Sequence, residues 1–524
     1  MRLPRTQILF GEESIKKIIQ GIKVLSDAVS STLGPRGRNV GIDTNVETII
    51  LHDGVSVAKA IHLEDPFEDF GVKIVREAAK KTVDEVGDGT SVSVLLAYSI
   101  INEAFKIISA GENPMTIRKS LEEARDKVLK YLDSIAKPVK TLQEKIQVAT
   151  ISAEDEQLGE LIAKTIDDMG IDGIVTVDES KSAETIVEKQ TGMQFDKGYI
   201  SPYFITDPGK MEATVEEPYI LISDKNLSIG QSLTPFLEAF SQVSNKLVVI
   251  APDVTDSALQ VLVVNKVRGI GSILAVQAPL FGEKQKSILQ DMCVLTGATL
   301  ISGDAGMNWQ NVTVDMAGHA DRITSTVDST LIVGGTGDPK LIDERVESLR
   351  EALKKEQSPF EQEKLRERIA KLSNGVAIIR VGGDTEVEMK ERKERAKDSV
   401  LATKAAVEEG ITSGGEIALL NAKIVLKDDV SLGGKILSNA LEAPFKKLLD
   451  NAGMKPDYWI EYLSDKPGMG IDLSDGKVKD LIEVGIVDPI KVVKCAVRNS
   501  ISTSIQIMTV GCSIVPIEEK NEKN

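Results

Sequence analysis

The chain changes its pattern of apolar residues twice along its length, and this feature limits the possible folds more than any single motif. Residues 14–33 and 72–86 carry apolar side chains at three- and four-residue steps, which is the spacing of amphipathic helices. From about 185 to 380, short β-type runs alternate with helical patterns, as in α/β domains. From about 386 the chain is again mostly helical. The sequence therefore predicts one helical domain split between the two ends, with an α/β domain inserted between them.

The charge balance and the absence of several motifs exclude whole classes of protein. With 63 Lys and Arg against 80 Asp and Glu, the net charge is −17, which argues against nucleic acid and anionic membranes as partners. No apolar run approaches the length of about 18 residues that a membrane span requires. Three Cys without a CxxC pair and three His without HExxH argue against a disulfide framework and a zinc enzyme. We expect a cytoplasmic globular protein.

The tetrapeptide Gly87-Asp88-Gly89-Thr90, between two predicted helices, is the sharpest local signal for chemistry. Two glycines let the backbone approach a ligand closely, and the helix that follows directs free N–H groups toward it. The carboxylate of Asp88 could hold Mg²⁺, which usually takes one or two carboxylates together with phosphate oxygens. On this motif alone, a helix–turn–helix corner capped by Asp88 or Thr90 is the alternative.

Other candidate positions have plain alternatives when they are taken singly. The loop from Thr32 to Arg38 either packs on a nucleotide or only ends a helix. Asp53 is a catalytic acid or a turn aspartate, and Asp398 is catalytic or part of a solvated helix face. Gly414-Gly415 and Asp488 are turn residues or parts of a nucleotide site, in which Asp488 would bind ribose.

The segment from Ala258 to Arg268 predicts a helix whose apolar residues spread well beyond one stripe. Such a helix is either buried on all sides or presents an apolar surface to a partner. Tyr199, Tyr203 and Phe204 form a second unusual group, because only 4% of the chain is aromatic.

Many long segments, in a constant order, resemble the group I chaperonins, the GroEL-type ring chaperones. They run from about Phe10 to Val515 and include TLGPRGRNV, DGVSVAKAI, GDGTSVSVLLA, GMQFDKGYISPYF and AAVEEGITSGGEIALL. The resemblance implies a multidomain α and α/β chaperonin fold. Its parts would be a mostly helical, split equatorial domain (1–136 and 410–524), a small α/β intermediate domain (137–191 and 376–409) and an inserted α/β apical domain (192–375). Hinges would lie at Gly192, Gly375 and Gly410.

The same resemblance implies a site for ATP with Mg²⁺ and K⁺. Asp88 would hold Mg²⁺, and Asp398, with Asp53 beside it, would activate the attacking water. The residues implied for K⁺ are Thr32, His52 and Ser91. The residues implied to surround the nucleotide are Thr32, Leu33, Gly34, Pro35, Gly87, Asp88, Gly89, Thr90, Ser91, Gly414, Gly415, Asp472, Leu473 and Asp488.

The implied function is ATP-driven folding of non-native polypeptides inside a double ring. Its partners would be unfolded proteins, a GroES-type lid and further copies of the chain in two stacked seven-membered rings. The implied surface for non-native chains consists of Tyr199, Tyr203, Phe204, Leu237, Leu259, Val263 and Val264. Departures from the family pattern at His52, Val92 and Asp472 motivate a second hypothesis, a ring-forming scaffold or peptide binder with weak ATPase activity. An unrelated small-molecule α/β enzyme is a third.

Overall fold

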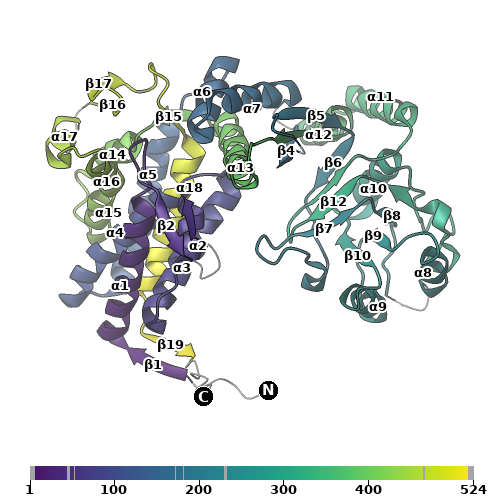
Figure 1. The fold of residues 1–524 in the computed structure, drawn as a ribbon, viewed down its shortest axis with the longest axis horizontal. Helices are drawn as coiled ribbons and strands as arrows, with labels where there is room; N and C mark the ends of the chain where they lie inside the picture. Colours follow the sequence, from purple (N-terminus) through teal and green to yellow (C-terminus); the bar gives the residue numbers. More distant parts are fainter. Residues whose placement is uncertain are drawn as a thin grey trace. The chain divides into compact units, whose positions relative to one another are not determined.

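The computed structural model describes residues 6–43, 48–51, 53–170, 173–180, 182–228, 233–463 and 466–516. The chain divides into two compact units. The split unit joins residues 1–164 and 385–524, and the inserted unit comprises residues 165–384. The predicted insertion of an α/β part between two helical ends is therefore present (Figure 1).

The split unit is built on long helices that both ends of the chain supply. α18 (Ile490–Met508) packs against α3 (Pro66–Val86), α4 (Thr90–Ser109) and α5 (Pro114–Ile135), so the two ends share one core (Figure 1). Ile18, Ile22, Leu25 and Val29 on one face of α1 (Gly11–Ser30) are fully buried, and the helix packs against α3 and α4. The other helices of this unit are α2 (Gly54–Ala60), α6 (Leu142–Ala153), α13 (Glu386–Glu409), α14 (Ile417–Ala422), α15 (Leu432–Ala440), α16 (Ala443–Asn451) and α17 (Pro456–Leu463). α7 (Glu156–Met169) contains the first boundary between the units.

α4 is long and apolar enough to cross a membrane by length and composition, and it is the one such helix among the residues that the structure describes. The expectation that no segment approaches this requirement was therefore wrong, because Glu103 and Lys106 interrupt the apolar run without lowering its mean hydropathy enough. Leu96, Ile100 and Ala104 are nevertheless buried among the neighbouring helices. α4 thus has the packing of a core helix.

Among the described residues, four two-stranded antiparallel sheets complete the split unit. In the first, a strand near one end of the chain pairs with a strand near the other end. The pairs are β1 (Thr6–Phe10) with β19 (Cys512–Pro516), β2 (Val40–Asp43) with β3 (Thr48–Leu51), β15 (Ile411–Ser413) with β18 (Val487–Pro489), and β16 (Met469–Asp472) with β17 (Lys477–Asp480).

The described part of the inserted unit contains three sheets. The parallel strands β10 (Ser272–Gln277), β9 (Lys246–Ala251) and β8 (Tyr219–Ile222) lie side by side, with β11 (Gly318–His319) antiparallel at the edge. Their near-continuous apolar runs fit strands that are covered on both faces. The second sheet has the order β6 (Gly192–Phe195), β13 (Thr330–Val333), β12 (Arg322–Ser325), β7 (Ala213–Glu216). The third has the order β4 (Ile174–Glu179), β14 (Val376–Val381), β5 (Ile186–Gln190).

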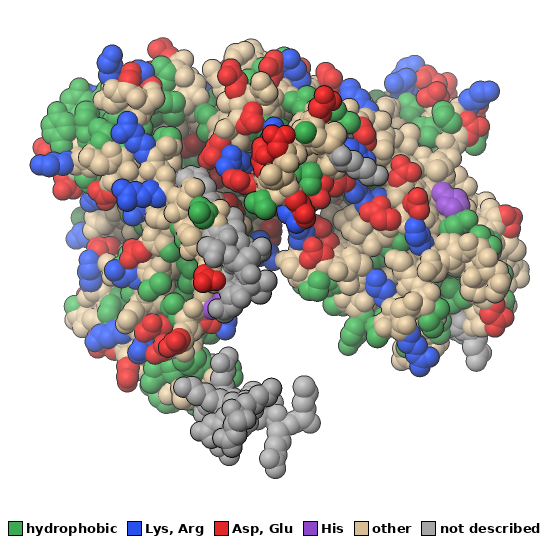
Figure 2. Space-filling view, viewed as in Figure 1, with side chains coloured by type: hydrophobic (Ala, Val, Ile, Leu, Met, Phe, Trp, Pro, Cys, Tyr) green, Lys and Arg blue, Asp and Glu red, His purple; other side chains and the backbone are tan. Residues whose placement is uncertain are grey.

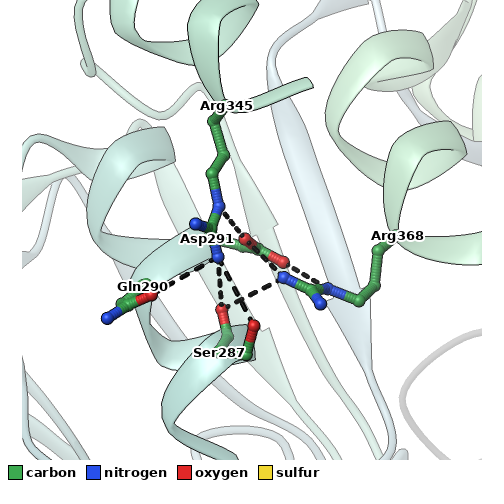
Figure 3. Close-up of polar contacts among 5 residues, drawn as sticks. All are labelled: Ser287, Gln290, Asp291, Arg345 and Arg368. Carbon is green, nitrogen blue, oxygen red and sulfur yellow. Dashed lines mark hydrogen bonds and ion pairs between the residues drawn. The ribbon is translucent and has the colours of Figure 1, made fainter. Parts of the chain in front are cut away.

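One buried carboxylate joins three helices of the inserted unit (Figure 3). The helices of this unit are α8 (Thr234–Phe240), α9 (Asp256–Val267), α10 (Gly282–Thr296), α11 (Pro339–Lys355) and α12 (Pro359–Asn374). Asp291 of α10 has a fully buried side chain. Its Oδ1 accepts a hydrogen bond from Nε of Arg345 in α11, and its Oδ2 accepts one from Nε of Arg368 in α12, both at 2.7 Å. This cluster, the Asp291 clamp, fixes α11 and α12 to α10.

Candidate functional site

The turn that carries Asp88 is shaped by two glycines in left-handed conformations. Gly87 ends α3 with φ of 75°, and Gly89 precedes α4 with φ of 87°. Non-glycine residues rarely adopt such φ values, so this turn requires glycine at both positions. Between them, the carboxylate of Asp88 accepts a hydrogen bond from the N–H of Gly89 at 2.6 Å.

The same turn lies against α13, which comes from the other end of the chain. A Cβ atom placed on Gly87 would lie 2.7 Å from the carbonyl oxygen of Asp398 and 2.5 Å from Cβ of Leu401. Only a residue without a side chain permits this approach. Asp88 and Asp398, which are about 300 residues apart in sequence, therefore lie at one place in the split unit.

Electrostatics show the same convergence. The pKa of Asp398 is raised to about 8 by burial first, and then by the negative charges of Asp88 and Asp53. The pKa of Asp88 is also raised, mainly by loss of solvation, although its side chain is exposed. The side chain therefore reaches solvent beside the atoms of α13 that crowd this turn.

Asp53 is the N-cap of α2. Its carboxylate accepts hydrogen bonds from the N–H groups of Val55 and Ser56 at 3.0 and 2.8 Å, which stabilises the start of the helix. A Cβ on Gly54 would lie 2.5 Å from Oγ of Ser91 and 3.3 Å from Val29. The start of α2 therefore meets the start of α4 and the end of α1.

The predicted loops around the nucleotide share a neighbour in α16. The loop at Thr32 is tied to this helix, because Nδ2 of Asn451 donates to the carbonyl oxygen of Leu33 at 3.0 Å. Gly34 packs against one methyl group of Leu448, and a Cβ on Gly415 would lie 3.8 Å from the other. The Thr32–Pro35 and Gly414–Gly415 loops thus converge on Leu448.

Asp488 and a residue that sequence reasoning missed, Glu416, extend the group of acids. Thr412 is the partner of Asp488 in the β15–β18 ladder, and Glu416 follows four residues after Thr412. The pKa of Asp488 is raised to about 7 by burial and by Asp88. The pKa of Glu416 is raised well above its ordinary value by burial, then by Asp488 and Asp88. An acid directly after Gly-Gly was the available sequence signal.

We call Asp53, Asp88, Asp398, Glu416 and Asp488 the acid cluster. Burial raises the pKa of Asp398, Asp488 and Glu416 because carboxylates lose solvation there, and among the charges that act on the three only Lys397 is positive. Adding a cation with bound phosphate would offset this repulsion, so the residues present fit Mg²⁺ held with a nucleotide. In the described part of the chain, no group of three or more Asp, Glu, His or Cys is arranged to hold a metal ion by itself.

Two predicted nucleotide residues are not brought into the acid cluster. Asp472 is engaged in its own hairpin, where its carboxylate accepts hydrogen bonds from Nζ of Lys479 at 2.7 Å and from Oγ of Ser474 at 2.6 Å. These bonds lower its pKa to about 2. Leu473 is buried in a core cluster. His52, predicted for K⁺, lies outside the described residues.

The predicted apolar surface is exposed in part only (Figure 2). Tyr203 is 69% exposed and Val264 of α9 is 43% exposed, while Leu237, Leu259 and Val263 are half-buried. Figure 2 shows hydrophobic side chains on the inserted unit where Figure 1 draws α9. Phe204 and Tyr199 are buried in the core of this unit. Their predicted exposure was wrong, because both side chains pack into this core, whereas Tyr203 of the same aromatic group reaches solvent.

The chain also contains exposed residues next to this surface that were not predicted. Val267 at the end of α9 is 67% exposed, and Ile270 just after it is 57% exposed. We call Tyr203, Val264, Val267 and Ile270 the apolar patch.

Comparison with known proteins gives the family. Residues 25–517 match the TCP-1/cpn60 chaperonin family, which is nearly the whole of the 524-residue chain. The chain belongs to this family. The chaperonin gp146 from the bacteriophage EL 2 (Pseudomonas aeruginosa), whose crystal structure was determined in the presence of ATP-BeFx, has a similar fold. The TM-score is 0.70 at 21% sequence identity, over 98% of this chain and 99% of that chain. The predicted chaperonin fold of α and α/β domains is confirmed.

Positions predicted as chaperonin hinges have close backbone contacts. Gly375 has φ of 65° and lies against the carbonyl oxygen of Gln190. Gly410 has φ of 94°, and a Cβ added to it would lie 2.6 Å from the carbonyl oxygen of Lys137. Gly192 has no left-handed φ, but an added Cβ would lie 2.6 Å from the carbonyl oxygen of Ile332. The boundaries between the compact units fall elsewhere, after residues 164 and 384. The three-domain division and the hinges stay predictions.

Proposed function

We propose that this chaperonin binds ATP with Mg²⁺ at the acid cluster and uses hydrolysis to drive the folding of non-native polypeptides. One observation carries the proposal: the turn at Gly87–Gly89 lies against the backbone of α13 at Asp398. This contact brings together one acid suited to a phosphate-bound cation and another suited to a water molecule.

The residues have distinct roles in this proposal. The turn at Asp88 and the start of α4 hold the phosphates, as helix N-termini do for anions. Bound Mg²⁺ would neutralise phosphate charge. Asp398 orients the attacking water and accepts its proton, and Asp53 lies beside it. Such phosphoryl transfer depends on positioning and electrostatics more than on covalent chemistry.

The apolar patch and the half-buried residues of α9 are the proposed surface for non-native chains. Exposed apolar side chains of loose specificity suit a binder of many unfolded partners. On the strength of the family resemblance, we extend the proposal to K⁺ at Thr32, His52 and Ser91, a GroES-type lid, two stacked seven-membered rings and three hinged domains. The acidic net charge of −17 supports the further proposal of a cytoplasmic location.

A scaffold with weak ATPase activity is the second candidate, favoured by the engagement of Asp472 with Lys479. The test is refolding of an aggregation-prone protein, with and without ATP, Mg²⁺, K⁺ and a lid protein, alongside steady-state ATP hydrolysis. We expect ATP-dependent recovery and turnover. An intact large assembly without turnover would favour the scaffold, and a monomer that captures no unfolded protein would exclude both functions.

A further inference from the structure

Three buried polar side chains meet where α3, α4 and α18 pack together, next to the turn at Asp88. Nδ2 of Asn499, in the middle of α18, donates to Oγ1 of Thr82, near the end of α3, at 2.9 Å. Oγ of Ser93, in the first turn of α4, donates to the same oxygen at 3.3 Å. All three residues are buried. We call Thr82, Ser93 and Asn499 the polar triad.

The hydrogen bonds of the polar triad converge on one hydroxyl group. Oγ1 of Thr82 donates its own proton to the carbonyl oxygen of Ala78 at 3.2 Å, while it accepts from Asn499 and Ser93. A hydroxyl group has one donor and two acceptor positions, so its full hydrogen-bonding capacity is used. Hydrogen bonds are directional, whereas apolar contacts are not. The triad therefore fixes the adjoining ends of α3 and α4 relative to each other and to α18.

The methyl group of Thr82 lies against the turn itself. A Cβ atom placed on Gly89 would lie 3.5 Å from this methyl carbon and 3.1 Å from a methyl carbon of Val492 in α18. The N–H of Ser93 donates to the carbonyl oxygen of Gly89 at 2.9 Å, and the N–H of Gly89 donates to the carboxylate of Asp88. A shift of the triad would therefore displace Asp88, the proposed magnesium ligand.

Stability alone does not account for the polar triad. Burying hydroxyl and amide groups costs free energy that their mutual hydrogen bonds only offset, and apolar side chains of similar shape pack helices about as well. Precise positioning does account for it, because a displacement of about 1 Å in the groups that align a reaction can slow it about 100-fold. Phosphoryl transfer depends mainly on such alignment.

We propose that Thr82 is a positioning residue of the nucleotide site. Asn499 and Ser93 hold it against Gly89, and it thereby fixes the turn that presents Asp88 and the first N–H groups of α4 to the phosphates. The proposal rests on the ATP-binding function proposed above. Thr82 is fully buried, so it acts through the turn and does not touch the nucleotide. It therefore governs the alignment of the reacting groups more than the affinity for ATP.

The test is steady-state ATP hydrolysis by the full-length assembly with Mg²⁺ and K⁺, well below the thermal midpoint of every protein compared. Thr82→Val removes the hydroxyl group and keeps a methyl group beside Gly89. Thr82→Ser keeps the hydroxyl group. Ser504→Ala is the matched control, because Oγ of Ser504 is a buried donor of α18 that bonds to the carbonyl oxygen of Ala97 at 3.3 Å, farther along α4 from the turn.

We expect Thr82→Val to lower kcat about tenfold or more and to change KM for ATP by less than about threefold, as for loss of an effect that acts on the transition state. Thr82→Ser should keep kcat within about threefold of wild type, and Ser504→Ala should match wild type in both constants. If Thr82→Val only lowered the thermal midpoint and kept the kcat of wild type, the triad would be merely structural and the positioning role would be overturned.

A double variant separates positioning from stability. Thr82→Val leaves the amide group of Asn499 without its acceptor, and this loss alone lowers stability. Thr82→Val combined with Asn499→Leu removes donor and acceptor together, so it should assemble as wild type does. We expect the same fall in kcat, and wild-type turnover in the double variant would also overturn the proposal. Absence of ATP hydrolysis by wild type would instead refute the proposed function, and the positioning role with it.

Discussion

Asp398 is half-buried, and three neighbouring acids act on its charge. A carboxyl group whose pKa lies near neutrality is suited to accept a proton from water. We predict that Asp398→Ala keeps the affinity for ATP with Mg²⁺ within about threefold and slows hydrolysis at least about 100-fold, the usual contribution of a general base. Nucleotide binding and single-turnover hydrolysis would separate the two effects.

The control for this prediction is on the same helix. Glu386→Gln changes an exposed acid in the first turn of α13 that pairs only with Lys390 in the ion pairs described, and it should leave hydrolysis unchanged. Normal turnover in Asp398→Ala would remove Asp398 from the mechanism.

The raised pKa of Asp398 also predicts how stability depends on pH in nucleotide-free protein. Its value of about 8 in the folded chain is above the ordinary 3.8, so the folded state binds more protons. The stabilisation is complete below about pH 4 and is lost as the pH rises toward 8. Between pH 5 and 8.5 in EDTA, the thermal midpoint of wild type should fall by about 3 °C more than that of Asp398→Asn.

This prediction is checked by scanning fluorimetry of both proteins across the pH range. If the thermal midpoints of the two proteins changed with pH in parallel, the pKa of Asp398 would not be raised in the folded state. Added Mg²⁺ with ADP should reduce the difference, because a bound cation favours the ionised carboxylate.

The sequence alone predicted some residues of the acid cluster and not others. The glycines around Asp88 signalled a special turn because few other residues adopt its φ angles. The contact of that turn with Asp398 was expected only from the family resemblance, since no local pattern joins positions so far apart. Glu416 escaped notice because a single acid after two glycines is common in ordinary turns.

At the scale of elements, α9 has an exposed side that should bind other chains. Val264 is 43% exposed, whereas Leu262 on the same helix is fully buried. We predict that Val264→Ser reduces capture of an unfolded protein about threefold or more and changes stability by less than about 1 kcal/mol. Capture is measured as suppression of aggregation at stoichiometric concentrations.

Leu262→Ser is the contrasting variant on this helix. It should lower the stability of the inserted unit by about 2 kcal/mol or more through loss of burial and an unsatisfied hydroxyl group. If Val264→Ser captured unfolded protein as well as wild type does, α9 would not be part of the binding surface.

Loss of the negative charge in the Asp291 clamp should open α11 and α12 before the rest of the inserted unit. Arg345 and Arg368 are 22% and 17% exposed, and both depend on one carboxylate. Asp291→Asn keeps the volume but removes the negative charge, and should cost about 3 kcal/mol. Hydrogen exchange should then increase in α11 and α12.

The control is Glu347→Gln, which changes an exposed ion pair with Arg350 and should cost less than about 0.5 kcal/mol of stability. Equal effects of the two variants on stability would contradict the clamp.

Periodicity predicted elements well where one face is buried. The stripes of α1 and α3 predicted both helices because helix geometry repeats every 3.6 residues. The bounds were less accurate: α1, expected at 14–33, begins and ends three residues earlier, and α3, expected at 72–86, begins six residues earlier. Periodicity could not predict which apolar residues of the inserted unit reach solvent. Tyr203 and Phe204 are adjacent, yet Tyr203 is exposed and Phe204 is in the core. That difference arises from tertiary packing.

At the scale of the whole molecule, the sequence predicted the split arrangement because the chain changes texture at the points where it leaves and re-enters the helical unit. The return to helical texture expected from about residue 386 agrees with the second boundary, after residue 384. The first boundary lies inside α7, after residue 164, whereas the change of texture was expected at about residue 185. Helical periodicity continues through α7, so local composition gives no signal of the division there.

The pairing of β1 with β19 leads to a prediction about assembly. A two-stranded sheet is marginally stable alone, and this one exposes Ile8, Phe10 and Ile514 at 46%, 69% and 56%. Exposed apolar strands with open edges favour pairing with another chain. We therefore expect Phe10→Lys combined with Ile514→Lys to dissociate the assembly, while helical content measured by circular dichroism is unchanged. Met211→Lys, at a 46% exposed position of the inserted unit, is the control. Light scattering that gave the same mass, several times that of one chain, for the double variant and the control would show that this sheet does not join the subunits.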